Sequence, residues 1–213
     1  MSSPLTADQI LRAYALGVFP MARQHDDPKL YWVDPEKRGI LPLKDFHLPR
    51  SLKKVLKHGV FEMKIDTAFD QVLELCAEST ARRPETWINS EIVRLFTDLH
   101  HAGLAHSVES WQDGQLVGGL YGLSLGSAFF GESMFSRTTD ASKAALAYLA
   151  ALMKKGGYTL LDTQFVTDHL AQFGAVEIPR RDYLRLLAQA LDRPASFQGG
   201  LGPDEVVELL TSP

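Results

Sequence analysis

Residues 116–136, LVGGLYGLSLGSAFFGESMFS, limit the possible folds of this chain more than any other stretch. Their single charged residue, Glu132, lies among glycine, aromatic and aliphatic residues. Two apolar runs separated by a Ser-Leu-Gly turn predict paired strands at residues 115–123 and 127–135. Two glycines inside the first strand, at 118–119, indicate a bulge or the close approach of another backbone. The chain must therefore build a sheet around a carboxylate that its neighbours cannot solvate.

Glu132 has two interpretations. Alternation along the second strand predicts that Phe130, Glu132 and Met134 share one face, subject to a bulge at Gly131. An acid beside an aromatic ring and a thioether is typical of a pocket wall. The alternative is a core strand whose glutamate ends in a buried ion pair.

A second acid interrupts a later apolar strand, YTLLDTQF at residues 158–165. Alternation puts Leu160, Asp162 and Gln164 on one face, with Asp162 and Gln164 about 6 to 7 Å apart along the strand. Glu132 and Asp162 are thus each isolated in apolar strands of one predicted sheet. We expect them to form a single acidic pocket.

The remaining pattern predicts an α+β fold. Strands first, then strands alternating with helices, indicate a mixed sheet with helices on its faces. A boundary near residue 59 divides a small N-terminal domain, 1–59, from a larger domain, 60–213. Asp113-Gly114 is a strong two-residue hairpin signal. Periodicity and capping residues predict helices at 6–16, 50–57, 66–76, 90–101, 140–155, 168–173 and 181–191, and further strands at 60–65, 104–111 and 176–178.

Composition narrows the class of protein. The 213 residues carry a formal net charge of -4, which disfavours non-specific coating of nucleic acid. The single cysteine, Cys76, excludes an internal disulfide and suits a reducing compartment. The N-terminus lacks a signal-peptide pattern and the longest apolar run is too short to span a bilayer, so we expect a cytoplasmic protein without membrane contact. His100, His101 and His106 match no two-ligand helix motif, so we expect no metal site.

One predicted helix has a basic face. Arg50, Lys53, Lys54 and Lys57 recur at spacings of three and four residues, with apolar residues on the other side. Such a face is either an ordinary solvated surface or a contact for phosphate groups.

Tyr31 and Trp32 are adjacent aromatic residues in a short predicted strand between turns. Their rings could stack on a flat ligand such as a nucleobase, although such a pair more often packs in a core.

Several strings along the chain coincide with one family: GVFPM, YWVDP, HLPRSLKK, ETWI, LHHAGLAHSVESW, LVGGLYG, FFGESMFSR, ASKAAL, LLDTQ and GAVEIPRRDYL. In this order and spacing, from about residue 11 to residue 187, the chain resembles the bacterial leucyl/phenylalanyl-tRNA-protein transferases. GESMFS followed by ASK and DTQ is the most specific part. The chain departs from the family's common FPW, WWSP and HxSRS strings, and it has Leu149 where some members have an aromatic residue.

The resemblance implies a small N-terminal domain followed by an acetyltransferase-like (GNAT-like) domain. It also implies an aminoacyltransferase that needs no cofactor. Such an enzyme moves Leu or Phe, and less well Met, from charged tRNA to the α-amine of proteins that begin with Arg or Lys, which marks them for N-end-rule degradation. We expect a monomer.

The same resemblance implies roles for individual residues. Asp162 and Gln164 would lie at the reaction centre, with Glu132 beside them. The other implied contacts are Tyr31 or Trp32 and Trp87 for the terminal adenosine, Leu120, Phe129, Met134 and Leu149 for the amino-acid side chain, and Arg50, Lys53, Lys54 and Lys57 for the tRNA backbone.

The chemistry suits these residues. An aminoacyl ester is already activated, so the enzyme chiefly has to hold the ester and the amine at attack distance. A relay from Asp162 through Gln164 and simple positioning of the amine both remain open. Glu132 and Asp162 would also offer a counter-charge for an N-terminal Arg or Lys.

Two other functions fit the same fold. An acyl-CoA-dependent N-acyltransferase would need a glycine-rich loop before the long helix, but SRTTDASKAAL there has no glycine and includes Asp140. A non-catalytic module that binds tRNA or peptides would not need Glu132, Asp162 and Gln164 together.

Overall fold

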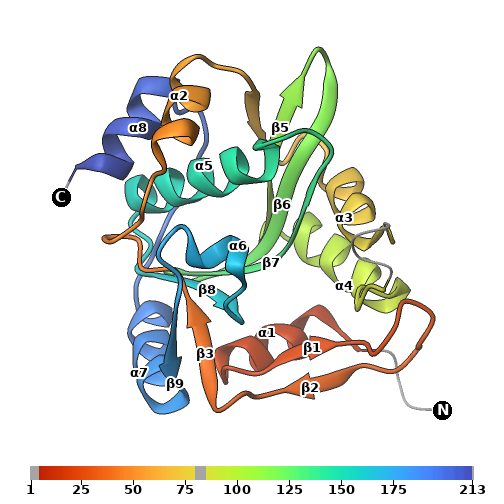
Figure 1. Ribbon diagram of the computed structural model, residues 1–213. Helices are drawn as coiled ribbons and strands as arrows, with labels where there is room; N and C mark the ends of the chain where they lie inside the picture. The colour runs from red at the N-terminus through yellow and green to blue at the C-terminus, as the bar shows by residue number, and fades with distance from the viewer. Residues whose placement is uncertain (1–4, 80–84, 213) are drawn as a thin grey trace.

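The centre of the molecule is a seven-stranded mixed sheet, seen in a computed structural model that describes residues 5–79 and 85–212 (Figure 1). Only β7 and β8 run parallel; the other neighbouring strands are antiparallel. The α+β fold with a mixed sheet is therefore confirmed. The strands lie in the order β4 (Glu62–Ile65), β5 (Ala105–Gln112), β6 (Gln115–Leu125), β7 (Ala128–Ser136), β8 (Leu160–Gln164), β3 (Lys37–Ile40) and β9 (Val176–Pro179).

Helices cover both faces of this sheet and create two hydrophobic cores (Figure 1). One core holds α2 (Arg50–Lys57), α5 (Ala141–Gly156), α6 (Asp168–Ala171) and α8 (Pro203–Thr211). The other holds α1 (Ala7–Ala15), α3 (Phe69–Ala77), α4 (Ser90–His101) and α7 (Arg180–Leu191). The helix predictions are confirmed within a few residues at each end, and α8 is an additional helix that the sequence did not predict. Within the described ranges, no helix is long and apolar enough to cross a membrane.

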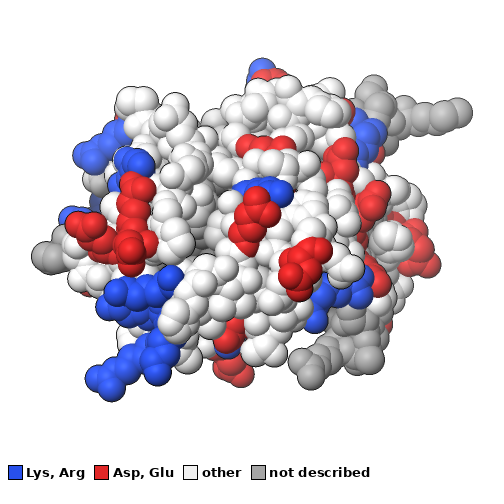
Figure 2. All heavy atoms as spheres, turned by 90° about the horizontal axis from the view of Figure 1, so that it is seen from above, with Lys and Arg blue, Asp and Glu red and all other residues white. Residues whose placement is uncertain are grey.

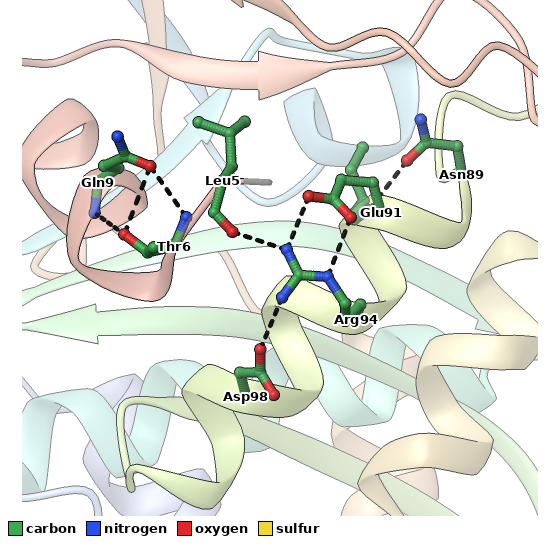
Figure 3. A network of polar contacts seen from close by, with 8 residues as sticks. Leu5, Thr6, Gln9, Asn89, Glu91, Arg94 and Asp98 are labelled. Atoms are coloured by element: carbon green, nitrogen blue, oxygen red, sulfur yellow. Dashed lines mark hydrogen bonds and ion pairs between the residues drawn. The ribbon is translucent and has the colours of Figure 1, made fainter. Parts of the chain in front are cut away.

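The first helix is fixed at its start. Thr6 and Gln9 form the predicted capping box, in which the main-chain N–H of Thr6 donates to Gln9 Oε1 over 3.0 Å. Arg94 of α4 donates from Nη2 to the carbonyl oxygen of Leu5 over 2.7 Å (Figure 3). The Arg94 bond ties the start of α1 to α4, and α1 carries Tyr14 into the core.

Strand β3 belongs to the main sheet, although it comes from the region assigned to the small N-terminal domain. Gly39 pairs with both Gln164 and Glu177. A side chain at position 39 would lie 2.6 Å from the main-chain carbon of Phe165, so only glycine allows this close packing. The division at residue 59 stays a prediction, and the sheet does not follow it. Strands β1 (Phe19–Met21) and β2 (Tyr31–Val33) form a separate antiparallel pair.

A bulge in β7 changes the direction of its side chains. Tyr121 pairs with Ser133 and Gly122 with Gly131, which leaves Glu132 as the extra residue. Side chains before and after the bulge are therefore out of phase. Phe130 belongs to the α1 core and Met134 packs against the α5 core, so the prediction that they share one face is wrong.

Candidate active site

A cavity of about 460 Å³ lies where the parallel strands β7 and β8 separate. Their ladder ends after Phe130 and Asp162, and the residues that follow diverge around the opening. This volume is within the range of about 300–1,000 Å³ usual for small-molecule sites. The described residues that line it are Phe19, Met21, Trp87, Leu120, Tyr121, Gly131, Glu132, Ser133, Met134, Phe135, Ser136, Ser142, Leu146, Leu149, Leu161, Thr163, Gln164, Phe165, Thr167, His169 and Leu170.

The part of the cavity next to α5 is apolar. Leu120 and Met134 come from the sheet, and Leu149 is a buried residue of the helix. This brings together three of the four residues predicted for the amino-acid side chain. Phe129 is not among the lining residues; its ring is buried in the core and stacked on Phe197 at 5.4 Å.

Another part of the wall is aromatic. Trp87 and Phe165 line the cavity together with Met21 of β1. Tyr31 and Trp32, the predicted adenosine contacts, are not among the described lining residues, and their role stays a prediction. They are on β2, which pairs with β1 in the register Met21 with Tyr31, so the β1 strand supplies the lining residue instead.

Glu132 is a carboxylate held in this largely apolar cavity. Tyr14, fully buried on α1, donates from its hydroxyl to Glu132 Oε1 over 2.8 Å. Burial raises the pKa of Glu132 to about 8; the Tyr14 hydrogen bond and the Arg38 charge oppose this rise, and the charge of Asp162 adds to it. Burial and the neighbouring Glu132 in turn raise the pKa of the Tyr14 hydroxyl. Tyr14 is thus a donor to Glu132 at every ordinary pH.

Gln164 ends β8 and lines the cavity beside Glu132. Its backbone is in the left-handed region, with φ of 56°. The amide is satisfied at both ends when Nε2 donates to the carbonyl oxygens of Gly131, at 2.8 Å, and Thr163, at 3.1 Å. The side-chain oxygen then takes the position 3.4 Å from Glu132 Oε1. At this separation the two oxygens are beyond the range of an O–H···O hydrogen bond.

Asp162 is sealed inside the protein and does not line the cavity. Arg38 of β3 makes a buried ion pair with it at 2.7 Å, and Tyr183 of α7 donates to it over 2.6 Å. The prediction of one pocket that exposes both acids is therefore wrong: Glu132 reaches the cavity and Asp162 does not. Asp162 contacts the site through the main-chain N–H of Gln164, at 2.8 Å.

The basic face of α2 is on the outside of the molecule. Arg50, Lys54 and Lys57 are exposed and Lys53 is partly exposed. No ion pair joins these four side chains to any residue of the described part of the chain. In Figure 2, which looks down on the side of α2 and α8, Lys and Arg side chains gather at the left edge beside a group of acidic ones. The face is thus open to an anionic partner.

One family of known proteins matches this chain over most of its length. A family profile described as leucyl/phenylalanyl-tRNA protein transferase matches residues 40–188, and the profile of that family's N-terminal domain matches residues 3–36. The chain belongs to the leucyl/phenylalanyl-tRNA protein transferase family. It is therefore an aminoacyltransferase that acts with aminoacyl-tRNA and protein substrates.

Relatives in this family are similar over nearly the whole chain. The leucyl/phenylalanyl-tRNA–protein transferase of Paramagnetospirillum magneticum is 64% identical over 194 residues, which cover 91% of this chain and 93% of the relative. That of Rhodospirillum rubrum is 58% identical, and the match covers 91% of this chain and 91% of the relative. That of Caulobacter vibrioides is 55% identical, and the match covers 93% of this chain and 92% of the relative. Among solved structures, L-PGS from Bacillus licheniformis is only distantly similar, with 14% identity, a TM-score of 0.41 and coverage of 77% of this chain and 55% of that one.

Sequence reasoning missed several residues in or next to this cavity. Tyr14 reads as part of the apolar stripe of α1, and Met21 replaces the aromatic residue expected after Phe-Pro. Arg38 lies in a four-residue strand too short to show a period. His169 also lines the cavity, and burial next to Lys143 lowers its pKa. The charged residue in a short strand, Arg38, is the one sequence signal for these missed residues.

Proposed function

We propose that this transferase moves Leu or Phe, and less well Met, from aminoacyl-tRNA to the α-amine of proteins that begin with Arg or Lys. The observation that carries the proposal is the composition of the cavity of about 460 Å³ at the end of the β7–β8 ladder. Its wall combines apolar side chains of leucine and methionine, flat aromatic groups, and one carboxylate at Glu132. An aminoacyl-adenosine has an apolar side chain and a flat base that match the apolar and aromatic groups of the wall. A cationic peptide end has a charge that Glu132 can balance.

The donor side of the proposal rests on the apolar wall. Leu120, Met134 and Leu149 surround space for a branched or aromatic side chain, and Trp87 and Phe165 offer faces for the terminal adenine. An apolar pocket separates side chains by only about 1 to 3 kcal/mol per methylene, so limited use of Met is expected.

The acceptor side rests on Glu132 and Gln164. A peptide α-amine has a pKa of about 7.7 to 8.0. Glu132, with a pKa of about 8, is therefore a matched proton acceptor for the α-ammonium group. The Gln164 side-chain oxygen, next to Glu132, accepts a hydrogen bond from the amine and orients its lone pair toward the ester.

The transfer step moves two protons of the α-ammonium group. The α-ammonium gives one proton to ionised Glu132, and the neutral amine attacks the ester carbonyl carbon. The new C–N bond forms, the bond to the ribose oxygen breaks, and the second amine proton passes to that oxygen. Glu132 then returns its proton to solvent. Binding of a cation near Glu132 favours its ionised form, so an N-terminal Arg or Lys assists this step.

The wider role follows from the same proposal. The exposed basic face of α2 is the candidate contact for the tRNA backbone, and the modified proteins would be marked for degradation in the cytoplasm. We expect the enzyme to work as a monomer.

An acyl-CoA donor is less well served. The first amide groups of α5 are already used, since Ala141 N–H donates to the carbonyl oxygen of Thr138 over 3.2 Å and Ser142 N–H donates to Ser136 Oγ over 3.3 Å. Few free donors therefore remain for a pyrophosphate.

One assay tests the proposal. Purified protein is given labelled Leu-, Phe- or Met-tRNA, or acetyl-CoA, with peptides that begin with Arg, Lys or Ala. We expect label only from the tRNAs and mainly on Arg and Lys peptides. Glu132→Gln should lose most transfer, whereas Glu205→Gln, at an exposed ion pair on α8, should retain it. Transfer from acetyl-CoA, or equal transfer to Ala peptides, would contradict the proposal.

A further inference from the structure

Arg38 is a charged residue sealed in the core beside the cavity, at 1% exposure. Its Nε donates to Asp162 Oδ1 over 2.9 Å and its Nη2 to Asp162 Oδ2 over 2.7 Å, in a two-pronged pair. Its Nη1 donates to the carbonyl oxygen of Gly17 over 2.9 Å. The guanidinium also lies over the rings of Phe19, at 4.4 Å, and Tyr183, at 4.6 Å. Three elements, β8, β1 and α7, and the turn after α1 therefore hold this one side chain.

Asp162 has no acceptor position left for another group. Oδ1 accepts from Arg38 and from the main-chain N–H of Gln164, and Oδ2 accepts from Arg38 and from the Tyr183 hydroxyl. A carboxylate offers about four lone-pair positions, so these bonds fill it. A proton could reach Asp162 only after one of them had broken. The bonding thus favours an anchor over a proton relay.

The anchor acts on a backbone that would not otherwise keep its shape. Gln164 has φ of 56°, a region that non-glycine residues seldom occupy. Its N–H bond to Asp162 holds this conformation, and the conformation directs the amide toward Gly131 and Glu132. A small displacement of Asp162 would therefore move the Gln164 amide at the cavity wall.

We propose that Arg38 is a positioning residue of the transferase, which fixes Asp162 and, through the main chain of Gln164, sets the position of the Gln164 amide for the acceptor amine. This inference rests on the proposed function and deepens it. It assigns Asp162 a structural contact with the site, and it makes β3 a part of the reaction centre.

The pair also leaves a nearly neutral environment behind Glu132. Arg38 alone would lower the pKa of Glu132 and Asp162 alone would raise it, and the two are bound together. The titratable and charged groups that face Glu132 from the neighbouring elements are Tyr14 on α1, Arg38 on β3, Tyr121 on β6, Asp162 on β8 and Tyr183 on α7.

The test compares Arg38→Lys with Arg94→Lys. Lysine keeps the charge at position 38 but cannot form the two-pronged contact. Arg94 is a matched control, because it also binds carboxylates of two residues and a main-chain carbonyl, but between α1 and α4, outside the cavity lining (Figure 3). Both variants are checked for folding by circular dichroism and thermal melting before transfer of Phe to an Arg peptide is measured.

For Arg38→Lys we expect kcat to fall roughly tenfold to a hundredfold, because a misplacement of about 1 Å is enough for such a loss. The KM for Phe-tRNA should stay within about twofold, since the apolar wall is untouched. Arg94→Lys should keep kcat even where its melting temperature falls. An unchanged kcat in folded Arg38→Lys, or an equal loss in Arg94→Lys, would overturn the inference.

A gentler variant covers the case in which Arg38→Lys does not fold. Tyr183→Phe removes only the hydroxyl that donates to Asp162. We expect a several-fold lower kcat with the KM for Phe-tRNA unchanged, and full kcat would overturn the inference. Asp162→Asn adds a pH readout: with the Arg38 charge left unopposed, the pH of half-maximal transfer should move down from that of the wild type. If the wild type itself transfers no amino acid, the proposed function fails instead.

Discussion

Glu132 should make the folded protein less stable as pH rises, and Glu132→Gln should remove this dependence. The folded-state pKa of Glu132 is about 8, against an ordinary value of 4.5, because burial disfavours its charged form. Between these two pH values the folded protein binds one more proton at this group than the unfolded chain does. Stability contributed by the protonated form is therefore complete below about pH 4.5 and is lost progressively as pH rises to 8.

The magnitude follows from the same numbers. A difference of about 3.5 pH units, at about 1.4 kcal/mol per unit, corresponds to about 5 kcal/mol. Glu132 is partly exposed to the cavity, so solvent screens the charge and we expect roughly half of this value, about 2 to 3 kcal/mol. Glutamine keeps an oxygen that accepts from Tyr14 and has no charge to bury.

Urea denaturation of the two proteins at pH 5, 6, 7 and 8 measures the effect. The free energy of unfolding of Glu132→Gln should exceed that of the wild type by an amount that grows with pH. Glu205→Gln is the control: its carboxylate is exposed and its pKa is lowered by Lys155, so it is ionised throughout this range. Wild-type and Glu132→Gln curves that stay parallel from pH 5 to pH 8 would refute the assignment of a raised pKa to Glu132.

Three further predictions concern other parts of the site. Tyr14→Phe removes the hydrogen bond that lowers the pKa of Glu132, so the pH of half-maximal transfer should rise by about 1 to 2 units, and an unchanged pH–rate profile would contradict this. Lys53→Ala with Lys54→Ala should weaken tRNA binding and reduce the slope of log affinity against log salt by about 1 per lysine; an unaltered slope would exclude α2 as a phosphate contact. Leu149→Ala should lower the free energy of unfolding by about 2 to 5 kcal/mol and favour Phe over Leu in a competition between charged tRNAs, whereas an unchanged ratio would remove Leu149 from the pocket.

Much of the fold could be predicted because its signals are local. The Thr6–Gln9 capping box and the apolar stripe of α1 are read from neighbouring residues, and the structure confirms both. Asp113 and Gly114 have the positive φ angles of a tight hairpin, as their types suggest. The approach of Ala141 to Gly118 also matches the expectation for a glycine inside a strand.

The site was only partly predictable, because its arrangement depends on distant partners. The bulge at Glu132 reverses the side-chain alternation after it. A regular alternation along the strand therefore put Phe130 and Met134 on one face, whereas they lie on opposite faces of the sheet. No pattern in the sequence indicated that Met21, which pairs with Tyr31, would line the cavity; the role of Tyr31 and Trp32 at the adenosine stays a prediction.

The sequence by itself determined that two carboxylates would lie in apolar strands of one mixed sheet, since hydrophobic period and residue type are properties of short segments. Only the tertiary structure decided that these carboxylates differ. Arg38 lies 124 residues from Asp162 and neutralises it in the core, whereas Tyr14, 118 residues from Glu132, offers only a hydroxyl and leaves that acid facing the cavity. The physical reason is that the charge state of a buried group depends on which distant side chains the fold brings to it, and no local pattern records that choice.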